Sequence, residues 1–290
     1  MPALLLRRRR LGNGSCRGIA ANNPSFIVHR HDRRPNFQWA SITHVFRWGC
    51  TAQIPTGGGP TGPQVLNKVE AIHLTVDKVA FRKALAAAEL SGPIWQQFAQ
   101  VVFPAVVRPV RHWQGRHTYK VNNNAELNQA VARCVRAAGG WYASPFVDKV
   151  AEYRVFVVQG RVACVARKTP SNPQAVAWNV AQGGSFDNVS FDNWPLKAVK
   201  QSIKAFNLSD LDFGGVDIMV DAEGGCHVLE INAAPSLTSP YRLSCMAKCF
   251  QWIVDKGKDR IGLIEDRGGW RKFVHPAVSA EAQLITGVRA

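Results

Sequence analysis

The sequence predicts an α+β fold in which two sheet-and-helix lobes follow a small N-terminal α/β region. The chain has 290 residues, 46% of them hydrophobic, which is enough apolar material for two or three packed units. Segments with apolar residues at helical spacing are interspersed with strand-like segments. Two pairs of strand-like segments are joined by turn residues as hairpins. Together these three observations favour lobes built from helices packed on sheets.

The N-terminal region covers residues 1–62 and is rich in arginine and glycine. One strand is expected at 41–49, and the turn residues of 56–63 predict a linker. From 63 to 90 apolar residues recur at helical spacing, which predicts a helical lead-in to the first lobe, 63–145. The rest of that lobe is expected to hold a strand at 103–110, a polar turn with a second strand at 111–121, and a helix at 124–140 that an asparagine caps and a glycine ends.

The second lobe is expected over 146–262, and a weakly patterned tail follows at 263–290. Its elements are predicted to be a hairpin at 152–168 around Gln159-Gly160, a helix at 193–209, a second hairpin at 213–232 and a helix at 239–256.

The net charge of +16 is concentrated near the N-terminus. The first 50 residues hold nine arginines, no lysine and one acid, Asp32. Such a segment favours a polyanion, which includes nucleic acid, a nucleotide phosphate or an acidic substrate. The run Arg7–Arg10 is the densest part and is a candidate polyanion contact. The open alternative is that this run is a solvated basic arm that keeps the protein in solution.

The cysteines and the N-terminus bear on the cellular compartment. The seven cysteines are scattered and include no CxxC pair, so reduced thiols are expected. Three leucines precede the arginine run, which is the reverse of the order in a secretory signal. No apolar run approaches the length of a membrane span, so no membrane contact is expected. These features predict a cytoplasmic protein.

The second hairpin carries polar residues where a buried strand would be apolar. With the turn centred just after Glu223, Asp217 lies opposite Glu230 and Gly215 lies opposite Asn232. Asp217, Glu230 and Asn232 then share one face and supply the hard oxygen donors that Mg²⁺ prefers, with Gly215 leaving room for a bound group. Magnesium held by few protein ligands suggests a nucleotide phosphate. The alternative is a solvent-facing polar edge on which each acid pairs with its own lysine or arginine.

A second polar segment offers phosphate contacts. Arg108 is expected on the strand 103–110, and a polar loop around Gly115 follows it. A strand-borne cation followed by a turn over the phosphates is one way to hold a nucleotide. The chain contains neither the GxxxxGK[ST] loop nor the GxGxxG loop that would indicate other nucleotide-binding classes.

Taken in order from about 64 to 245, these residues resemble the ATP-grasp superfamily. The most specific element is "GGVDIMV…VLEINAAPSL", which resembles its metal-binding hairpin. The segments "LNKVEAIHLTVDK", "PAVVRP", "HWQGRH", "ASPFV", "EYRVFV" and "WNVAQGG" resemble, in the same order, its lead-in, its phosphate-binding strand, its phosphate loop, its interlobe hinge, its ribose-binding strand and the turn before the metal hairpin. The resemblance implies an ATP-grasp fold, in which two α+β lobes clasp ATP. Within the superfamily the chain is similar to carboxylate–amine ligases, such as the ribosomal-protein glutamate ligases and the short ligases of tailed phages.

The resemblance implies a role for each matched residue. Contacts to ATP are implied for Lys78, Arg108 and Gly115 at the phosphates, for Pro145, Phe146 and Val147 at the adenine, and for Glu152 at the ribose. Magnesium ligation is implied for Asp217, Glu230 and Asn232, and roles in the reaction for Arg154, Lys168, Asn179 and Ser236. His112 and His117 stand where members of the superfamily often carry glycine, and residues 1–62 are only loosely similar to the domain that usually precedes the lobes.

The implied reaction is an ATP-dependent, magnesium-requiring ligation. ATP phosphorylates a substrate carboxylate, ADP leaves, and the amine of an amino acid, peptide or protein attacks the acyl phosphate to form an amide or peptide bond. Two alternatives remain open. One is a nucleotide-binding protein with this fold and no ligase activity, and the other is a nucleic-acid-binding protein that uses its arginine-rich N-terminus.

Overall fold

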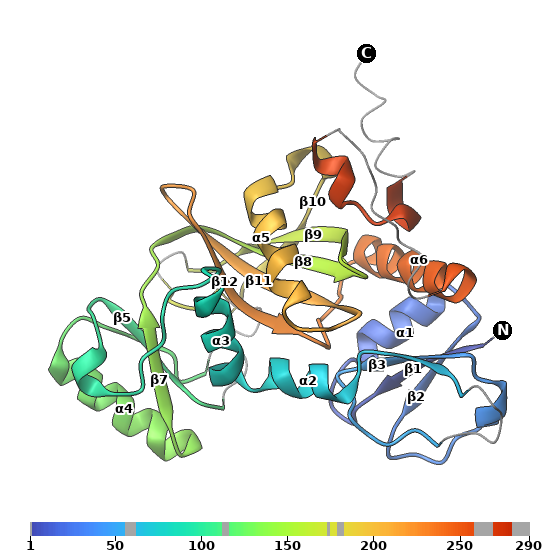
Figure 1. The fold of residues 1–290 in the computed structure, drawn as a ribbon, viewed down its shortest axis with the longest axis horizontal. Helices are drawn as coiled ribbons and strands as arrows, with labels where there is room; N and C mark the ends of the chain where they lie inside the picture. Colours follow the sequence, from blue (N-terminus) through green and yellow to red (C-terminus); the bar gives the residue numbers. More distant parts are fainter. Residues whose placement is uncertain are drawn as a thin grey trace.

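The structure, a computed structural model, describes residues 2–55, 62–111, 116–172, 175–178, 183–257 and 269–279. Figure 1 shows a central five-stranded sheet flanked on one side by a small three-stranded sheet with its helix, and on the other by a four-stranded sheet. This mixture of helices and largely separate sheets confirms the predicted α+β class. None of the helices within these ranges is long and apolar enough to cross a membrane.

The N-terminal sheet is entirely parallel, in the order β2-β1-β3-β4. Its strands and its helix are β1 (Ala3–Arg7), α1 (Asn13–Ala21), β2 (Phe26–Arg30), β3 (His44–Trp48) and β4 (Gln64–Leu66). All five residues of β1 are buried, although the sequence predicted only the strand near 41–49. Because β4 pairs with β3, this sheet extends past residue 62, where the sequence placed the end of the first region.

The small lobe consists of a three-stranded sheet, ordered β6-β5-β7, and one covering helix. The predicted helix over 63–90 is in fact the strand β4 and two helices that meet at Asp77, whose carboxylate caps the second helix by accepting from Ala80 N. Asn123 and Gly139 cap the two ends of α4, as predicted. The elements are α2 (Val69–Val76), α3 (Lys78–Ala87), β5 (Ala105–Pro109), β6 (Tyr119–Val121), α4 (Asn124–Ala138) and β7 (Trp141–Pro145).

The large lobe holds the central antiparallel sheet, ordered β10-β9-β8-β11-β12. Both predicted hairpins are present, as β8–β9 and β11–β12, while β10 was not predicted. The elements are β8 (Lys149–Val158), β9 (Arg161–Thr169), β10 (Ser185–Val189), α5 (Leu196–Asn207), β11 (Phe213–Asp221), β12 (Cys226–Asn232) and α6 (Pro240–Lys256). Short 3₁₀ helices lie at Trp39–Ser41, Phe98–Gln100, Phe191–Asn193, Gly269–Phe273 and Pro276–Val278.

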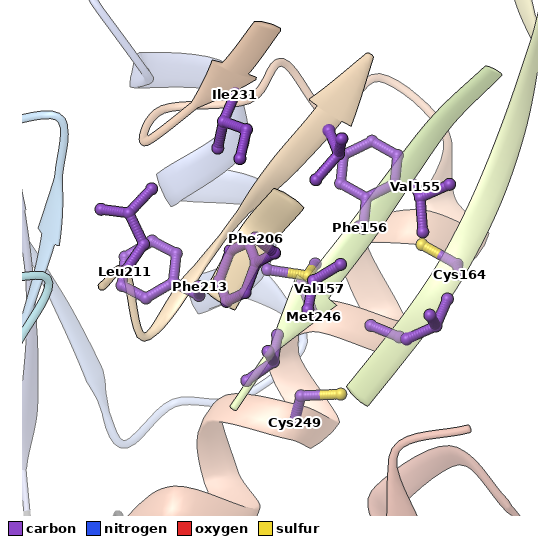
Figure 2. Close-up of a cluster of buried hydrophobic side chains, with 14 of the residues drawn as sticks. Val155, Phe156, Val157, Cys164, Phe206, Leu211, Phe213, Ile231, Met246 and Cys249 are labelled. Atoms are coloured by element: carbon purple, nitrogen blue, oxygen red, sulfur yellow. The ribbon is translucent and has the colours of Figure 1, made fainter. Parts of the chain in front are cut away.

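The core lies on both faces of the central sheet (Figure 2). Alternate residues of β11 point to opposite faces, so Gly214 lies against Phe206 of α5, whereas the ring of Phe213 packs 4.8 Å from that of Phe250 on α6. The face that α6 covers at Phe213 continues along β11 to Gly215 and Asp217. An apolar, close-packed region therefore supports one end of the sheet face that carries the predicted site.

Candidate active site

The β11–β12 hairpin brings the three predicted metal ligands to one face. Asp217 pairs with Glu230, and Gly215 pairs with Asn232, which confirms the predicted register at this end of the hairpin. Nearer the turn the register is shifted by one residue, and Ile218 pairs with Val228. The prediction was wrong there, because Asp221 N donates to Gly225 O and the turn is centred on Glu223 itself. A bulge at Leu229 absorbs the difference.

Gly215 has a different purpose from the one predicted. A Cβ atom at this position would lie 2.9 Å from Cβ of Pro235 and 3.3 Å from Cδ of Arg154. The space beside Asn232 is therefore filled by these two side chains rather than left open for a bound group. The glycine lets Pro235 and Arg154 approach the strand closely.

A buried network of charges surrounds Asp217. Arg154, on the neighbouring strand β8, donates from Nε and Nη2 to the two Asp217 oxygens at 2.6 and 2.8 Å. Lys168 of β9 donates to Asp217 at 2.9 Å and also to Glu152. Lys149 donates to the other Glu152 oxygen at 2.5 Å. Asp217 and Glu152 are 3% and 2% exposed, so these pairs are shielded from water.

Glu230 forms a second, half-buried group beside this network. Its Oε2 accepts from Lys78 Nζ at 2.7 Å, and its Oε1 accepts from Asn232 Nδ2 at 3.0 Å. Lys78 is the first residue of α3, so this ion pair joins the helix of one lobe to the hairpin of the other. Each acid thus pairs with its own cations, as in the alternative raised from the sequence, but Asp217 and Glu152 are buried and not on a solvent-facing edge.

The neighbouring cations keep both hairpin acids ionised. Burial alone would raise the pKa of Asp217, but Arg154 and Lys168 outweigh it and lower that pKa below its usual value. For Glu230 burial acts in the same direction, and Lys78 lowers the pKa well below the usual range. Burial would lower the pKa of Lys168, but the charges of Asp217 and Glu152 raise it. The cluster is therefore fully charged at neutral pH.

A cavity of about 340 Å³ lies between the small lobe and the hairpin. Pro145, Phe146 and Val147 line it where β7 passes into β8, and Met219 of β11 lines it from the large lobe. The Phe146 N–H donates to Pro104 O at 3.0 Å, which fixes the position of this connection. The three predicted adenine-side residues are thus brought together on one cavity.

Two buried arginines face the same cavity without an acidic partner among the described residues. Arg108 of β5 donates to Ser144 Oγ at 2.9 Å, and Arg82 of α3 lies 6.0 Å from the ring centroid of Tyr142. Burial, and then the charge of Arg82, lower the pKa of Arg108 to about 10. Both side chains nevertheless remain cations at neutral pH, which favours an anion in the cavity.

Comparison with known proteins agrees with this geometry. Residues 76–252 match the model of an ATP-grasp domain, the third family of its clade. The chain belongs to this ATP-grasp family. Membership of the family supports ATP-dependent ligase activity in general. No curated protein matches the chain.

The solved structures that match are ATP-grasp ligases. The ATP-grasp ligase PsnB complexed with a minimal precursor gives a TM-score of 0.62 at 15% identity, over 88% of this chain and 100% of that chain. PsnB with a phosphomimetic variant of the minimal precursor, Mg and ADP gives 0.56 at 15% identity, over 85% and 97%. D-alanine–D-alanine ligase from Bacillus anthracis gives 0.63 at 12% identity, over 89% and 97%. At these identities the likeness shows that the chains share a fold.

Magnesium, which the ATP-grasp family implies, can be tested against the donor atoms present. Within the described ranges no three His, Cys, Asp or Glu side chains converge as a metal-binding set. Glu230 Oε2 already holds a cation, because the Lys78 ammonium stands where a metal ion would bind, and the Asn232 carboxamide adjoins it. Asp217 has both oxygens bound by Arg154. Glu230 and Asn232 therefore fit magnesium, and Asp217 joins them when one Arg154 bond opens.

Some predicted ATP-grasp residues lie elsewhere, and others were missed. Gly115, Asn179 and His112 fall outside the described residues. Ser236 is exposed in the turn after β12. The sequence did not single out Lys149, Arg82 or Met219. The strand alternation around Glu152 could have indicated Lys149, because it lies at the start of the same strand, but nothing local marks a helix residue such as Arg82 as part of a cavity in the fold.

Proposed function

We propose that the protein is an ATP-dependent, magnesium-requiring carboxylate–amine ligase that forms an amide or peptide bond and releases ADP and phosphate. The observation that carries this proposal is the placement of Asp217, Glu230 and Asn232 on one face of the β11–β12 hairpin, among four cations and near an interlobe cavity. In PsnB, which shares the fold, a solved complex contains Mg and ADP together with a precursor variant.

The cavity is the proposed nucleotide site. Backbone groups of Pro145 and Val147 would contact the adenine edge, with Phe146 and Met219 against the ring. Arg108, with Arg82 beside it, would neutralise phosphate charge. Glu152, the predicted ribose contact, has both oxygens bound by Lys149 and Lys168, so that role requires one of these lysines to move.

Charge balance links the cations to the nucleotide. Lys78, Arg154 and Lys168 now neutralise Glu230 and Asp217. When these acids hold magnesium, which would bridge phosphate oxygens and offset their charge, the same lysines and arginine are released to contact the phosphates or the substrate carboxylate. The cluster therefore contains a matched set of donors and acceptors for both halves of a metal–nucleotide pair.

The proposed reaction has two steps. A substrate carboxylate oxygen attacks the γ-phosphorus of ATP, the bond to the β-phosphate oxygen breaks, and ADP leaves. The amine nitrogen then attacks the acyl carbon and loses a proton, and phosphate departs with the C–O electron pair. Arg154 and Lys168 are placed to stabilise the transferring phosphoryl group, and Ser236 lies in the turn that follows the metal-binding strand.

The test is a Glu230→Gln variant. Because the amide keeps the shape but loses the charge that holds the cation, we expect Mg²⁺-dependent ADP release to fall by about 100-fold or more. Release is measured with Mg-ATP over a panel of amino acids, short peptides and acidic polymers. Glu70→Gln, an exposed glutamate in the first turn of α2, is the matched control and should retain activity. Unchanged ADP release in Glu230→Gln would refute the assignment of the metal site.

A further inference from the structure

The N-terminal sheet collects most of the arginines of the first 50 residues at one edge. Since β1, β2 and β3 are parallel neighbours, their carboxyl ends lie together. Of the nine arginines, all but Arg17 of α1 lie at or just after these ends. We call this group the arginine edge; it comprises Arg7–Arg10 from β1, Arg30, Arg33 and Arg34 from β2, and Arg47 from β3.

The arginine edge carries little compensating charge. Asp32 is its one acid, and this carboxylate pairs with Arg30 at 2.5 Å. Arg8, Arg9, Arg10, Arg33 and Arg34 are exposed. Arg7 is 9% exposed; its Nη1 donates to the carbonyls of Arg8 and Arg9 at 3.1 and 3.4 Å, while its buried Nε has no hydrogen-bond partner among the described residues. An exposed concentration of guanidinium groups of this kind attracts anions.

The strand order places this edge where parallel sheets bind ligands. The chain passes from β1 to β2 on one side, and then to β3 on the other side of β1. The point between β1 and β3, where the connections diverge, is the usual ligand position outside the carboxyl ends of the strands. Arg7–Arg10 follow the first of these strands, and Arg47 lies near the end of the second.

The arginine edge also adjoins the proposed reaction centre. A Cβ at Gly49, just after β3, would lie 2.8 Å from Cβ of Ala234 in the turn after Asn232. In the same turn, Leu237 N donates to Ser15 Oγ of α1 at 3.0 Å. The segment that follows the metal-binding strand is therefore packed directly against the carboxyl edge of the N-terminal sheet.

We propose that the arginine edge binds an acidic peptide segment, which delivers one of its carboxylates to the reaction centre. This inference rests on the proposed function and names its carboxylate substrate. Successive same-side carboxylates of an extended peptide are about 7 Å apart, a span that long arginine side chains on strands about 5 Å apart can match. The aromatic residues of this region do not form a platform for stacking bases, since Phe46 and Trp48 are fully buried and Phe37 and Trp39 pack on each other. Carboxylates are therefore favoured over nucleic acid.

The test uses a fluorescein-labelled hexaglutamate peptide and the full chain, with binding measured by fluorescence anisotropy. In an Arg9→Glu/Arg33→Glu variant the dissociation constant should rise by about tenfold or more, and the salt dependence should weaken. The matched control is Arg133→Glu/Arg136→Glu, which makes the same change of charge on exposed residues of α4, at the opposite end of the molecule (Figure 1). The control should bind the peptide within about twofold of the unmodified chain.

Each outcome decides the proposal. Equal losses in the two variants would show a general charge effect and overturn it, as would unchanged binding in the edge variant. Tighter binding of a 12-nucleotide oligothymidylate, lost on substitution of Arg9 and Arg33 while hexaglutamate fails to bind, would assign the edge to nucleic acid and overturn it as well. Failure of the proposed ligase function has a separate signature, since it would appear as Mg-ATP turnover insensitive to Glu230→Gln while hexaglutamate binding still depended on the arginine edge.

Discussion

The two charged regions of the molecule are built in opposite ways. In the central sheet, Asp217 and Glu152 are buried and their oxygens are bound by cations from β8 and β9. In the N-terminal sheet, arginines greatly outnumber the single acid Asp32, and most of them are exposed. Buried charges are tolerated only when they are paired, whereas exposed charges can remain unpaired at small cost because water and salt screen them.

This difference separates charges that hold the fold from charges available to a ligand. The paired cluster fixes the relative positions of three strands, so its members share their energies and cannot be removed singly without consequence. The arginine edge carries no such constraint and can bind and release an anion. Substitutions that remove the same kind of residue from each region should therefore differ most in stability.

The largest effect is expected for Asp217→Ala. The substitution leaves Arg154 and Lys168 buried near Asp217 with one carboxylate fewer, so the free energy of unfolding should fall by about 3–5 kcal/mol, as measured by chemical denaturation. Asp32→Ala removes an exposed aspartate and should leave the unfolding curve unchanged. Similar losses in the two variants would contradict the distinction between the regions.

A smaller effect is expected from pH. The pKa of Glu230 in the folded chain lies below that of the unfolded chain, so its contribution to stability is complete above the ordinary carboxyl pKa and is lost as pH falls toward the folded value. Between pH 6 and pH 3 the free energy of unfolding should therefore fall further in the unmodified chain than in Glu230→Gln, by about 1–2 kcal/mol. Parallel pH profiles for the two chains would show that Lys78 does not stabilise this carboxylate.

The smallest effect tests the junction between the two regions. Ser15→Ala removes the acceptor of the Leu237 N–H, and both groups are buried, so unfolding should cost about 1 kcal/mol less. The control is Ser41→Ala, whose exposed hydroxyl donates to Gln38 O within a 3₁₀ turn. If the two serine variants were equally stable, the turn after β12 would not depend on its contact with α1.

The hairpin and helix patterns of the large lobe were predictable because their signals are local. Gln159-Gly160 and the Asn123 cap mark boundaries that short-range chemistry decides. The strand β1 was missed because Ala3–Leu6 are buried on both faces, so the run lacks the alternation of a half-exposed strand. The break at Asp77 was missed because helical spacing continues across it.

At the site, the convergence of Asp217, Glu230 and Asn232 followed from strand pairing alone. Their actual partners did not, because Lys168 and Lys78 arrive from a different strand and a different lobe. The arginine edge was equally hidden. Three separate arginine groups become one surface only through the parallel strand order, which is a property of the tertiary fold.

The bulge at Leu229 has a consequence for the reading frame of the hairpin. Continuing the register of the turn without it would set Glu230 opposite Val216, on the side that packs against α5, and Ile231 opposite Gly215. One extra residue thus exchanges the inner and outer faces of the last three positions of β12. The apolar spacing of two and then three, at Cys226, Val228 and Ile231, is the imprint of this phase shift. Deleting Leu229 alone would turn the whole acidic end of the strand inside out without altering any residue that takes part in the chemistry.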